Sequence, residues 1–171
     1  MIKHVFSYAG QSTGETGAQT GFSFIELLAS IAILGMLATV AMPLMETTIR
    51  RQKESDLRTA LREIRQGIDA YKLATTAGKI VVLSSQSGYP PSLVELVGGV
   101  NDVTHPGARL YFLRRIPRDP FITDMSVTAI DSWGKRSFSS SAENPVAGDD
   151  VFDVYTTSSA TGLNGLPYRQ W

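Results

Sequence analysis

A long apolar stretch near the start of the chain dominates its pattern of hydrophobic and polar positions. From Leu27 to Met45 the sequence carries no charged residue. This length is close to the ~20 residues that a helix needs to cross the hydrocarbon core of a membrane. One charge, Glu26, stands directly before the run and behind Phe22 and Phe24. An unpaired carboxylate in such surroundings costs on the order of a few kcal/mol, so we expect Glu26 to have a partner.

A second apolar pattern, at helical spacing, follows the run. Hydrophobic side chains recur there at intervals of four and three residues, which places them on one face of a helix. They are Leu57, Leu61, Ile64, Ile68 and Tyr71. We predict one long helix from about Phe22 to Ala77, ended by Gly78, with a globular domain packed on this stripe.

The pattern beyond Gly78 indicates shorter elements. We predict a β-rich run at 80–83, a short helix at 91–97, and strands at 126–130, 137–139 and 151–155. Trp133-Gly134-Lys135 and Asn164-Gly165 are predicted turns. The expected fold class is α+β, a long N-terminal helix packed on a small antiparallel sheet.

Composition narrows the function classes. The chain has 16 Lys and Arg residues against 16 Asp and Glu residues, so its net charge gives no argument for nucleic-acid binding. It has no cysteine, which excludes disulfides, thiol catalysis and cysteine metal sites. The serines show no paired His and Asp arrangement, and we expect no enzyme. Arg114, Arg115 and Arg118 are a basic cluster, which either contacts another protein chain, binds nucleic acid or is a solvated face.

The segment from Gly21 to Leu28, Gly-Phe-Ser-Phe-Ile-Glu-Leu-Leu, resembles the class III signal of type IV pilins and type II secretion pseudopilins. The resemblance implies cleavage between Gly21 and Phe22 by a prepilin peptidase and N-methylation of Phe22. Glu26 then takes the fifth mature position, and Pro43 matches a proline common at the twenty-second. We expect Glu26 to pair with the amine of a neighbouring subunit and so to direct assembly.

The later part of the chain resembles the major, G-type pseudopilins. The matching segments are Tyr89-Pro90, 116–120, Trp133-Gly134 and 151–155. The stretch between Pro120 and Trp133 is longer than in that branch and predicts an inserted hairpin or loop. The implied fold is type IV pilin-like.

The resemblance divides the chain into a leader at 1–21, a transmembrane and assembly helix at 22–45, an amphipathic continuation at 46–78 and a periplasmic domain at 79–171. Gly35 and Pro43 interrupt the helical pattern, and in the family such a segment can unwind when subunits pack. The implied location is the bacterial inner membrane, single-pass, with the N-terminus in the cytoplasm. Arg50, Arg51 and Lys53 after the run favour the opposite orientation by the positive-inside rule.

The expected function is a pseudopilin subunit that polymerises into a periplasmic filament driving type II-like secretion. Its implied partners are further copies, other pseudopilins, the prepilin peptidase, an inner-membrane assembly platform and an ATPase, with nucleic acid not expected. One alternative is a type IV pilus subunit for adhesion, motility or DNA uptake. Another is a membrane-anchored periplasmic binding module that does not polymerise.

The resemblance suggests one metal, calcium, because G-type pseudopilins bind it in the loop after the last strand. Here that loop, 156–167, contains no acidic residue. Asp149, Asp150 and Asp153 lie before or on the strand and are the calcium candidates. We expect no cofactor; the alternative to calcium is a loop held by hydrogen bonds from Thr156, Thr157, Ser158, Ser159 and Asn164.

Overall fold

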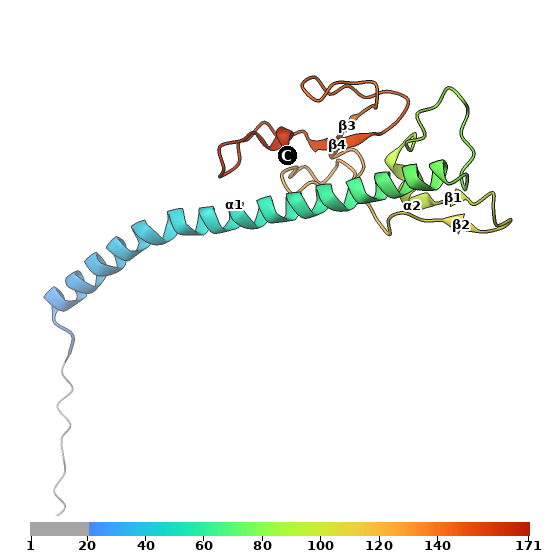
Figure 1. Cartoon of the computed structure of the whole chain (residues 1–171). Helices are drawn as coiled ribbons and strands as arrows, with labels where there is room; N and C mark the ends of the chain where they lie inside the picture. Colours follow the sequence, from blue (N-terminus) through green and yellow to red (C-terminus); the bar gives the residue numbers. More distant parts are fainter. Residues whose placement is uncertain (1–20) are drawn as a thin grey trace, which may run out of the picture. The chain divides into compact units, whose positions relative to one another are not determined.

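The computed structural model describes residues 21–171, without the side chains of residues 40–44. The predicted leader therefore lies outside the described residues, except for Gly21. The chain forms two compact units that divide between Leu44 and Met45. The long helix α1 (Phe24–Thr76) begins in the first unit and ends in the second (Figure 1).

The predicted stop of α1 is confirmed and has a clear cause. Gly78 adopts φ +71°, in the left-handed region that favours glycine. The Gly78 N–H donates to the Thr75 carbonyl at 3.0 Å, and the Lys79 N–H donates to the Ala74 carbonyl at 3.0 Å. This pair of bonds is a Schellman motif, which satisfies carbonyls that the helix end leaves free.

Gly35 and Pro43, the predicted helix-breaking residues, do not end α1. The helix continues through both positions. A proline inside a helix removes one backbone hydrogen bond and can be tolerated by local bending. The side chain of Pro43 lies outside the described residues, and unwinding in packed subunits stays a prediction.

The apolar stripe of α1 is the centre of the core in the second unit, as predicted. Its five residues, Leu57, Leu61, Ile64, Ile68 and Tyr71, are between 0% and 4% exposed. Helix α2 (Leu93–Gly98) adds Leu93 and Leu96 to this cluster. Burial of each such side chain contributes about 1.5–3 kcal/mol. The stripe therefore fixes which face of α1 remains open to solvent.

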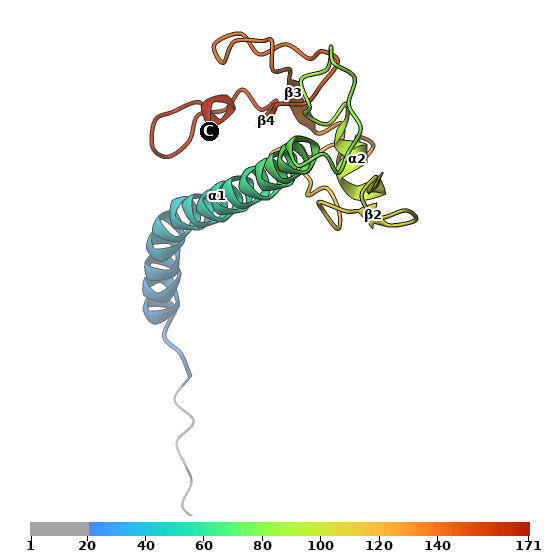
Figure 2. The ribbon, with the colours of Figure 1, turned by 45° about the vertical axis from the view of Figure 1, so that its right-hand side comes forward.

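Two small antiparallel sheets lie along the second half of α1. Strands β1 (Val100–Asn101) and β2 (Arg109–Leu110) pair near α2, with Val100 opposite Leu110. Strands β3 (Trp133–Arg136) and β4 (Asp153–Thr156) pair with Trp133 opposite Thr156. A 3-10 turn, η1 (Tyr168–Gln170), follows near the end of the chain (Figure 2). The predicted α+β class is confirmed.

Two predicted strands, 126–130 and 137–139, and the predicted β-rich run at 80–83 are wrong. None of these segments forms the ladder of hydrogen bonds that defines a strand. Residues 80–83 and 137–139 belong to no strand, and 126–130 is a series of turns. In the last case the Arg118 guanidinium donates to the carbonyls of Asp124 and Val127, and the Asp124 carboxylate accepts the N–H of Ser126 at 2.9 Å. The insertion before Trp133 is thus a self-closed loop.

The predicted turn at Trp133-Gly134-Lys135 is strand β3 instead. Gly134 has a packing role there, because a Cβ at this position would lie 2.4 Å from the ring of Tyr155 on the paired strand. The glycine lets that ring cross the strand closely. The turn predicted at Asn164-Gly165 is confirmed, with Gly165 at φ +80° and its N–H bonded to the Gly162 carbonyl.

Among the described residues, which leave out part of the apolar run at 40–44, no helix is long and apolar enough to cross a membrane.

Candidate functional site

The start of α1 places Glu26 in the first helical turn. Gly21, Phe22 and Ser23 precede the helix, and the Ser23 carbonyl accepts the N–H groups of Glu26 at 3.0 Å and Leu27 at 3.1 Å. The carboxylate of Glu26 is exposed and makes no hydrogen bond or ion pair with the described residues. An acidic side chain in this turn is favoured by the helix dipole. A cation from outside the chain can therefore reach it.

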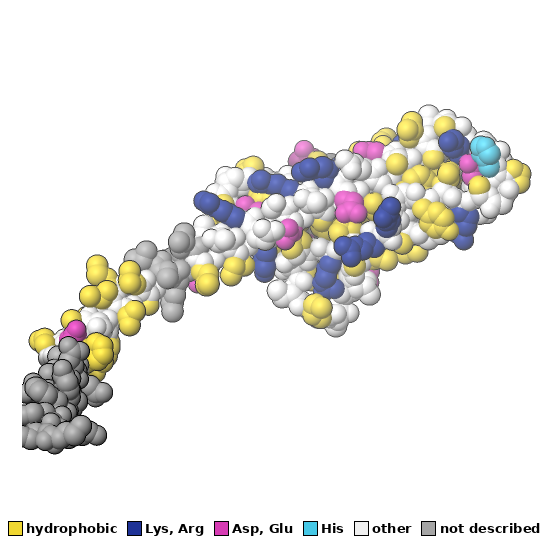
Figure 3. All heavy atoms as spheres, turned by 90° about the horizontal axis from the view of Figure 1, so that it is seen from below, with side chains coloured by type: hydrophobic (Ala, Val, Ile, Leu, Met, Phe, Trp, Pro, Cys, Tyr) yellow, Lys and Arg dark blue, Asp and Glu magenta, His cyan; other side chains and the backbone are white. Residues whose placement is uncertain are grey.

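Large hydrophobic side chains surround Glu26 and remain exposed. Phe22 is 87% exposed and Ile25 is 73% exposed. The other exposed members are Phe24, Leu27, Leu28, Ile31, Ile33, Leu34, Met36 and Leu37. Figure 3 shows hydrophobic side chains along this part of the chain. Contiguous apolar surface of this kind marks a membrane or protein contact.

Gly35 lies within this exposed segment. A Cβ built there would meet no atom within 4 Å, so the position has open space beside it in a single chain. A missing side chain on an otherwise bulky apolar helix allows another helix to approach closely. The structure thus leaves room for the close approach of a second helix at Gly35.

The three calcium candidates do not share one site. Asp149 is exposed, and Asp150 and Asp153 take part in separate networks. Within residues 21–171, outside the side chains not described, no three His, Cys, Asp or Glu residues gather in a way that would hold a metal ion. The expected absence of a bound metal stays a prediction, with these three residues as the calcium candidates.

Asp150 holds two loops together. One carboxylate oxygen accepts the hydroxyl of Ser87, and the other accepts the hydroxyl of Ser137 at 2.7 Å and the N–H of Phe138 at 2.9 Å. Partial burial raises the pKa of Asp150, but these hydrogen bonds together outweigh it and set the pKa below its ordinary value. Folding therefore favours the charged form of the Asp150 carboxylate.

Asp153 is neutralised by two arginines. Its carboxylate lies 2.8 Å from Nε of Arg65 on α1 and 3.2 Å from a terminal nitrogen of Arg136 on β3. Arg65 also donates to the carbonyls of Val154 at 3.2 Å and Trp171 at 2.8 Å. This network attaches β4 and the end of the chain to α1.

Glu54 is a site residue that the sequence analysis missed. It is 6% exposed, and its carboxylate accepts the N–H of Leu163 at 2.7 Å and the hydroxyl of Tyr168 at 2.8 Å. Arg50 donates to the same hydroxyl at 3.2 Å. Burial raises the pKa of the Tyr168 phenol, the Arg50 bond opposes this, and the Glu54 bond adds to it. The sequence signal that could have identified Glu54 is its spacing. It stands three residues before Leu57, which places it on the buried face of the helix beside the apolar stripe.

Three of the five residues named in the alternative to calcium, Thr156, Ser158 and Asn164, make hydrogen bonds in the loop after β4. The hydroxyl of Thr156 accepts the Ser158 N–H at 3.1 Å, and the hydroxyl of Ser158 accepts the Ala160 N–H at 3.3 Å. The Asn164 side chain accepts the Leu166 N–H at 3.1 Å. These bonds are local turn closures.

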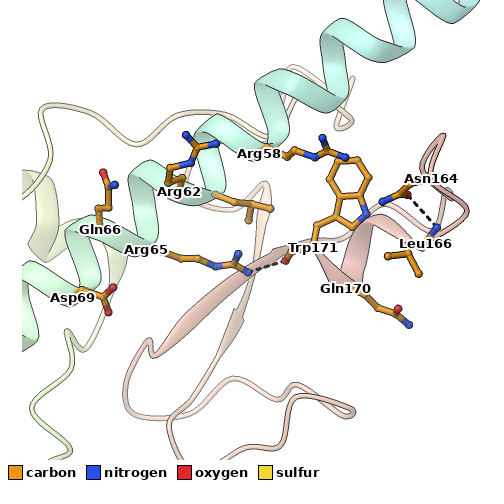
Figure 4. Close-up of a pocket in the computed structure, with 10 residues that line it drawn as sticks. Arg58, Arg62, Arg65, Gln66, Asp69, Asn164, Leu166, Gln170 and Trp171 are labelled. Atoms are coloured by element: carbon orange, nitrogen blue, oxygen red, sulfur yellow. Dashed lines mark hydrogen bonds between the residues drawn. The ribbon is translucent and has the colours of Figure 1, made fainter.

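A groove of about 540 Å³ runs between α1 and this C-terminal segment (Figure 4). The Arg58 guanidinium lies 4.2 Å from the centre of the Trp171 ring, and Arg62 lies one turn further along α1. Neither arginine has a carboxylate within salt-bridge distance among the described residues. The groove therefore leaves two arginines open to an external partner.

The basic cluster predicted around Arg114 is divided. Arg114 and Arg115 are exposed, whereas Arg118 is partly buried and is occupied by the carbonyls of the 120–132 loop. Two exposed arginines remain, and no described residue forms an ion pair with either.

Comparisons with known proteins agree with the motif at the start of α1. Residues 17–42 match the prokaryotic N-terminal methylation motif, a match that includes Gly21, Phe22 and Glu26. No solved structure matches the chain.

Curated relatives cover most of the chain at low identity. The chain is 25% identical to the type IV major alpha-pilin of Moraxella bovis over 90% of its own length and 92% of that protein. It is 24% identical to the type II secretion system core protein G of Klebsiella michiganensis, over 78% of the chain and 89% of the relative. It is 28% identical to core protein G of Pectobacterium carotovorum, over 82% and 88%. These relatives are structural subunits and not enzymes.

Proposed function

We propose that this pilin-like chain, a homologue of type IV pilins and type II secretion pseudopilins, is a pseudopilin subunit that polymerises into a periplasmic filament and drives type II-like protein secretion. The proposal is supported by the methylation motif at 17–42 and by relatives that are core protein G of type II secretion systems.

The observation that carries the proposal is an exposed carboxylate without a partner, surrounded by exposed apolar side chains. Glu26 stands four residues after Phe22, and both lie within the matched motif. Hydrolysis of the Gly21–Phe22 peptide bond frees an α-amine on Phe22, and N-methylation keeps its positive charge. In a low-dielectric interior, the amine of one subunit and Glu26 of its neighbour then stabilise each other.

The proposed location follows from the same segment. The uncharged run is stored in the bacterial inner membrane as a single pass, with residues 79–171 in the periplasm. Assembly requires the prepilin peptidase, an inner-membrane platform protein and a cytoplasmic ATPase. Other pseudopilins join the same filament.

A type IV pilus subunit is the second candidate function. It is favoured by the match to the Moraxella bovis pilin, which extends over 92% of that protein. Deletion of the gene separates the two. Loss of exoproteins from the medium supports the pseudopilin, and loss of surface fibres with secretion intact supports the pilus.

The assembly role of Glu26 is tested in a host that supplies a prepilin peptidase. We expect the mature full-length chain to begin at methylated Phe22 by mass spectrometry. Glu26→Leu should enter the membrane at the wild-type level and fail to appear in sheared filaments. Glu46→Leu, which removes an exposed carboxylate beyond the run, should assemble normally.

Two results would contradict the proposal. Recovery of a membrane protein that retains residues 1–21 would remove the required amine. Normal filaments from the Glu26→Leu chain would show that the carboxylate has another purpose. A correctly processed wild-type chain that forms no filament would favour the non-polymerising binding module.

No metal is required by the proposed function. Asp150 and Asp153 already accept hydrogen bonds from protein donors, which compete with calcium for their oxygens. A calcium titration of the purified chain should leave the melting temperature unchanged. A rise of several degrees that chelator reverses would place a metal in this region.

A further inference from the structure

A cleft of about 960 Å³ lies beside the end of α1 in the second unit. Its walls are the loop that follows α1, helix α2, and the loop between β3 and β4, which lies next to the loop after α1 (Figure 2). The volume is at the upper end of the roughly 300–1,000 Å³ that is usual for ligand-binding clefts. The proposed function makes no use of this cleft.

Residues 80–83 line one wall of the cleft and have the side-chain pattern of a strand. Ile80 is 6% exposed and Val81 is 74% exposed, and Val82 is less exposed than either of its neighbours. Alternation with a period of two residues is that of a β-strand, and β-branched side chains favour strands. The segment nevertheless belongs to no ladder.

The backbone of residues 80–82 has no hydrogen-bond partner in the described part of the chain. On one side of them, the Val103 N–H donates to the Lys79 carbonyl at 2.9 Å. On the other side, the Leu83 N–H donates to the side-chain oxygen of Gln86 at 3.0 Å. Unpaired N–H and C=O groups along a β-prone segment are a template for an added strand.

Tyr71 brings a further polar group without a partner to the cleft. Its side chain is 4% exposed and lines the cleft, and its hydroxyl makes no hydrogen bond with the described residues. Burial raises the pKa of the Tyr71 phenol, and the charge of Glu95 adds to this, so the hydroxyl keeps its proton. Buried hydroxyls normally have a hydrogen-bond partner. This one can donate to a carbonyl of an occupant.

The walls of the cleft combine negative charge with apolar surface. Glu95 and Asp149 line it, and neither forms an ion pair with a described residue. Val81 and Phe138, which is 58% exposed, supply apolar surface on opposite walls. An occupant that complements this lining carries both positive and apolar side chains.

We propose that the cleft binds a segment of a partner protein as an added β-strand along residues 80–82. The segment carries apolar side chains at alternate positions and a Lys or Arg that faces Glu95 and Asp149. Main-chain hydrogen bonds supply affinity in this mode, and the side chains supply specificity. The inference goes beyond the proposed function and does not require the chain to polymerise.

A defined peptide tests the cleft in the purified full-length chain in detergent. The probe is a fluorescent peptide of eight residues, within the usual length of a strand, in which valines alternate with threonine and arginine. We expect saturable binding by fluorescence anisotropy. Two further peptides carry N-methyl groups on the amides of one edge or of the other. At least one of them should bind about tenfold more weakly, because it cannot donate to the carbonyls of residues 80–82.

Variants of the chain test the side-chain contacts. Glu95→Lys should weaken binding of the arginine peptide by about tenfold, because it reverses a charge in the cleft. Glu63→Lys is the matched control, since Glu63 is exposed on α1 outside the cleft, and should bind like the wild type. Tyr71→Phe should weaken binding by about fivefold and leave the melting temperature unchanged. A purely structural role of the hydroxyl would lower the melting temperature instead.

Amide hydrogen exchange locates the bound peptide. The N–H groups of residues 80–82 should exchange rapidly in the free chain, because they are unpaired. Saturation with the arginine peptide should slow their exchange, whereas the N-methylated peptide that binds weakly should not.

The results that would overturn this inference are separate from those that concern filaments. Absence of saturable binding, equal binding of all three peptides, or unchanged exchange at residues 80–82 would each overturn it. Self-association of the full chain that Glu95→Lys abolishes, without peptide binding, would assign the cleft to a second copy and also overturn it. None of these results measures polymerisation. Normal peptide binding by a chain that forms no filament would overturn the proposed function alone.

Discussion

At the scale of single residues, Glu54 connects two distant parts of the chain. Its carboxylate accepts bonds from Leu163 and Tyr168, more than one hundred residues away, while it is 6% exposed. A buried carboxylate is tolerated only when donors satisfy it. Here a backbone N–H and a phenol do so.

Glu54→Leu should lower the free energy of unfolding by about 2–4 kcal/mol, because it leaves the buried Tyr168 hydroxyl and the partly buried Leu163 N–H without this acceptor. Denaturant unfolding of the full chain in detergent measures the loss. Glu54→Gln keeps an acceptor oxygen and should lose less. Glu63→Leu, at an exposed position of the same helix, should change stability by less than about 0.5 kcal/mol. Wild-type stability in the Glu54→Leu chain would show that the bonds do not matter.

Asp150 gives the fold a dependence on acid. Its pKa lies below the ordinary value of 3.8 in the folded chain, so folding favours the charged form. The stabilisation is complete above pH 3.8 and is lost as the pH falls below it.

Asp150→Asn should therefore lower the melting temperature at neutral pH, by an amount that corresponds to about 1 kcal/mol. The difference from the wild type should shrink below pH 3.8. Melting curves between pH 3 and 7 measure it, with Asp149→Asn as the exposed control. A constant difference down to pH 3 would show that ionisation is not involved.

At the scale of elements, the end of α1 depends on one glycine. Gly78 has φ +71°, and no atom lies within 4 Å of a Cβ built there. A side chain at this position would therefore cost backbone strain and would not collide with a neighbour. Gly78→Ala should lower stability by about 1 kcal/mol. Gly98→Ala is the matched control, because Gly98 also has open space but no positive φ. Equal effects of the two substitutions on the midpoint of denaturation would exclude this explanation.

The long helix could be predicted from the sequence because its signals are local. The spacing of Leu57, Leu61 and Ile64 defines a buried face, and Gly78 defines an end. The strands could not be placed as well. Each pairs over two to four residues, which leaves too few alternating positions to recognise. Gly134 suggested a turn, whereas it serves a contact with Tyr155 that only the folded chain reveals.

Only part of the candidate site could be predicted from the sequence. Gly21, Phe22 and Glu26 stand in one short segment and were recognisable by their order. Glu54 was not, because its partners, Leu163 and Tyr168, come from the other end of the chain. A charged residue on an apolar stripe signals that a partner exists but not which one.

At the scale of the whole molecule, the two units differ in how far their apolar side chains are exposed to solvent. The second unit buries its core, whereas the hydrophobic residues between Phe22 and Leu37 remain exposed. The chain therefore needs its surroundings to cover the first unit.

A chain limited to residues 45–171 should fold and remain monomeric without detergent, because the core lies within it. The full chain should associate unless detergent or lipid is added. Sedimentation of both proteins measures the difference. Association of the shortened chain at similar concentration would place a further adhesive surface in the second unit.

Two loops beside the sheets are closed in large part by bonds among their own residues. Arg118 and Asp124 close one, and Ser137 with Asp150 closes another. A segment closed in this way can gain or lose residues without disturbing the helix beneath it. Insertions and deletions should therefore be tolerated more readily in this outer coat than in the buried spine.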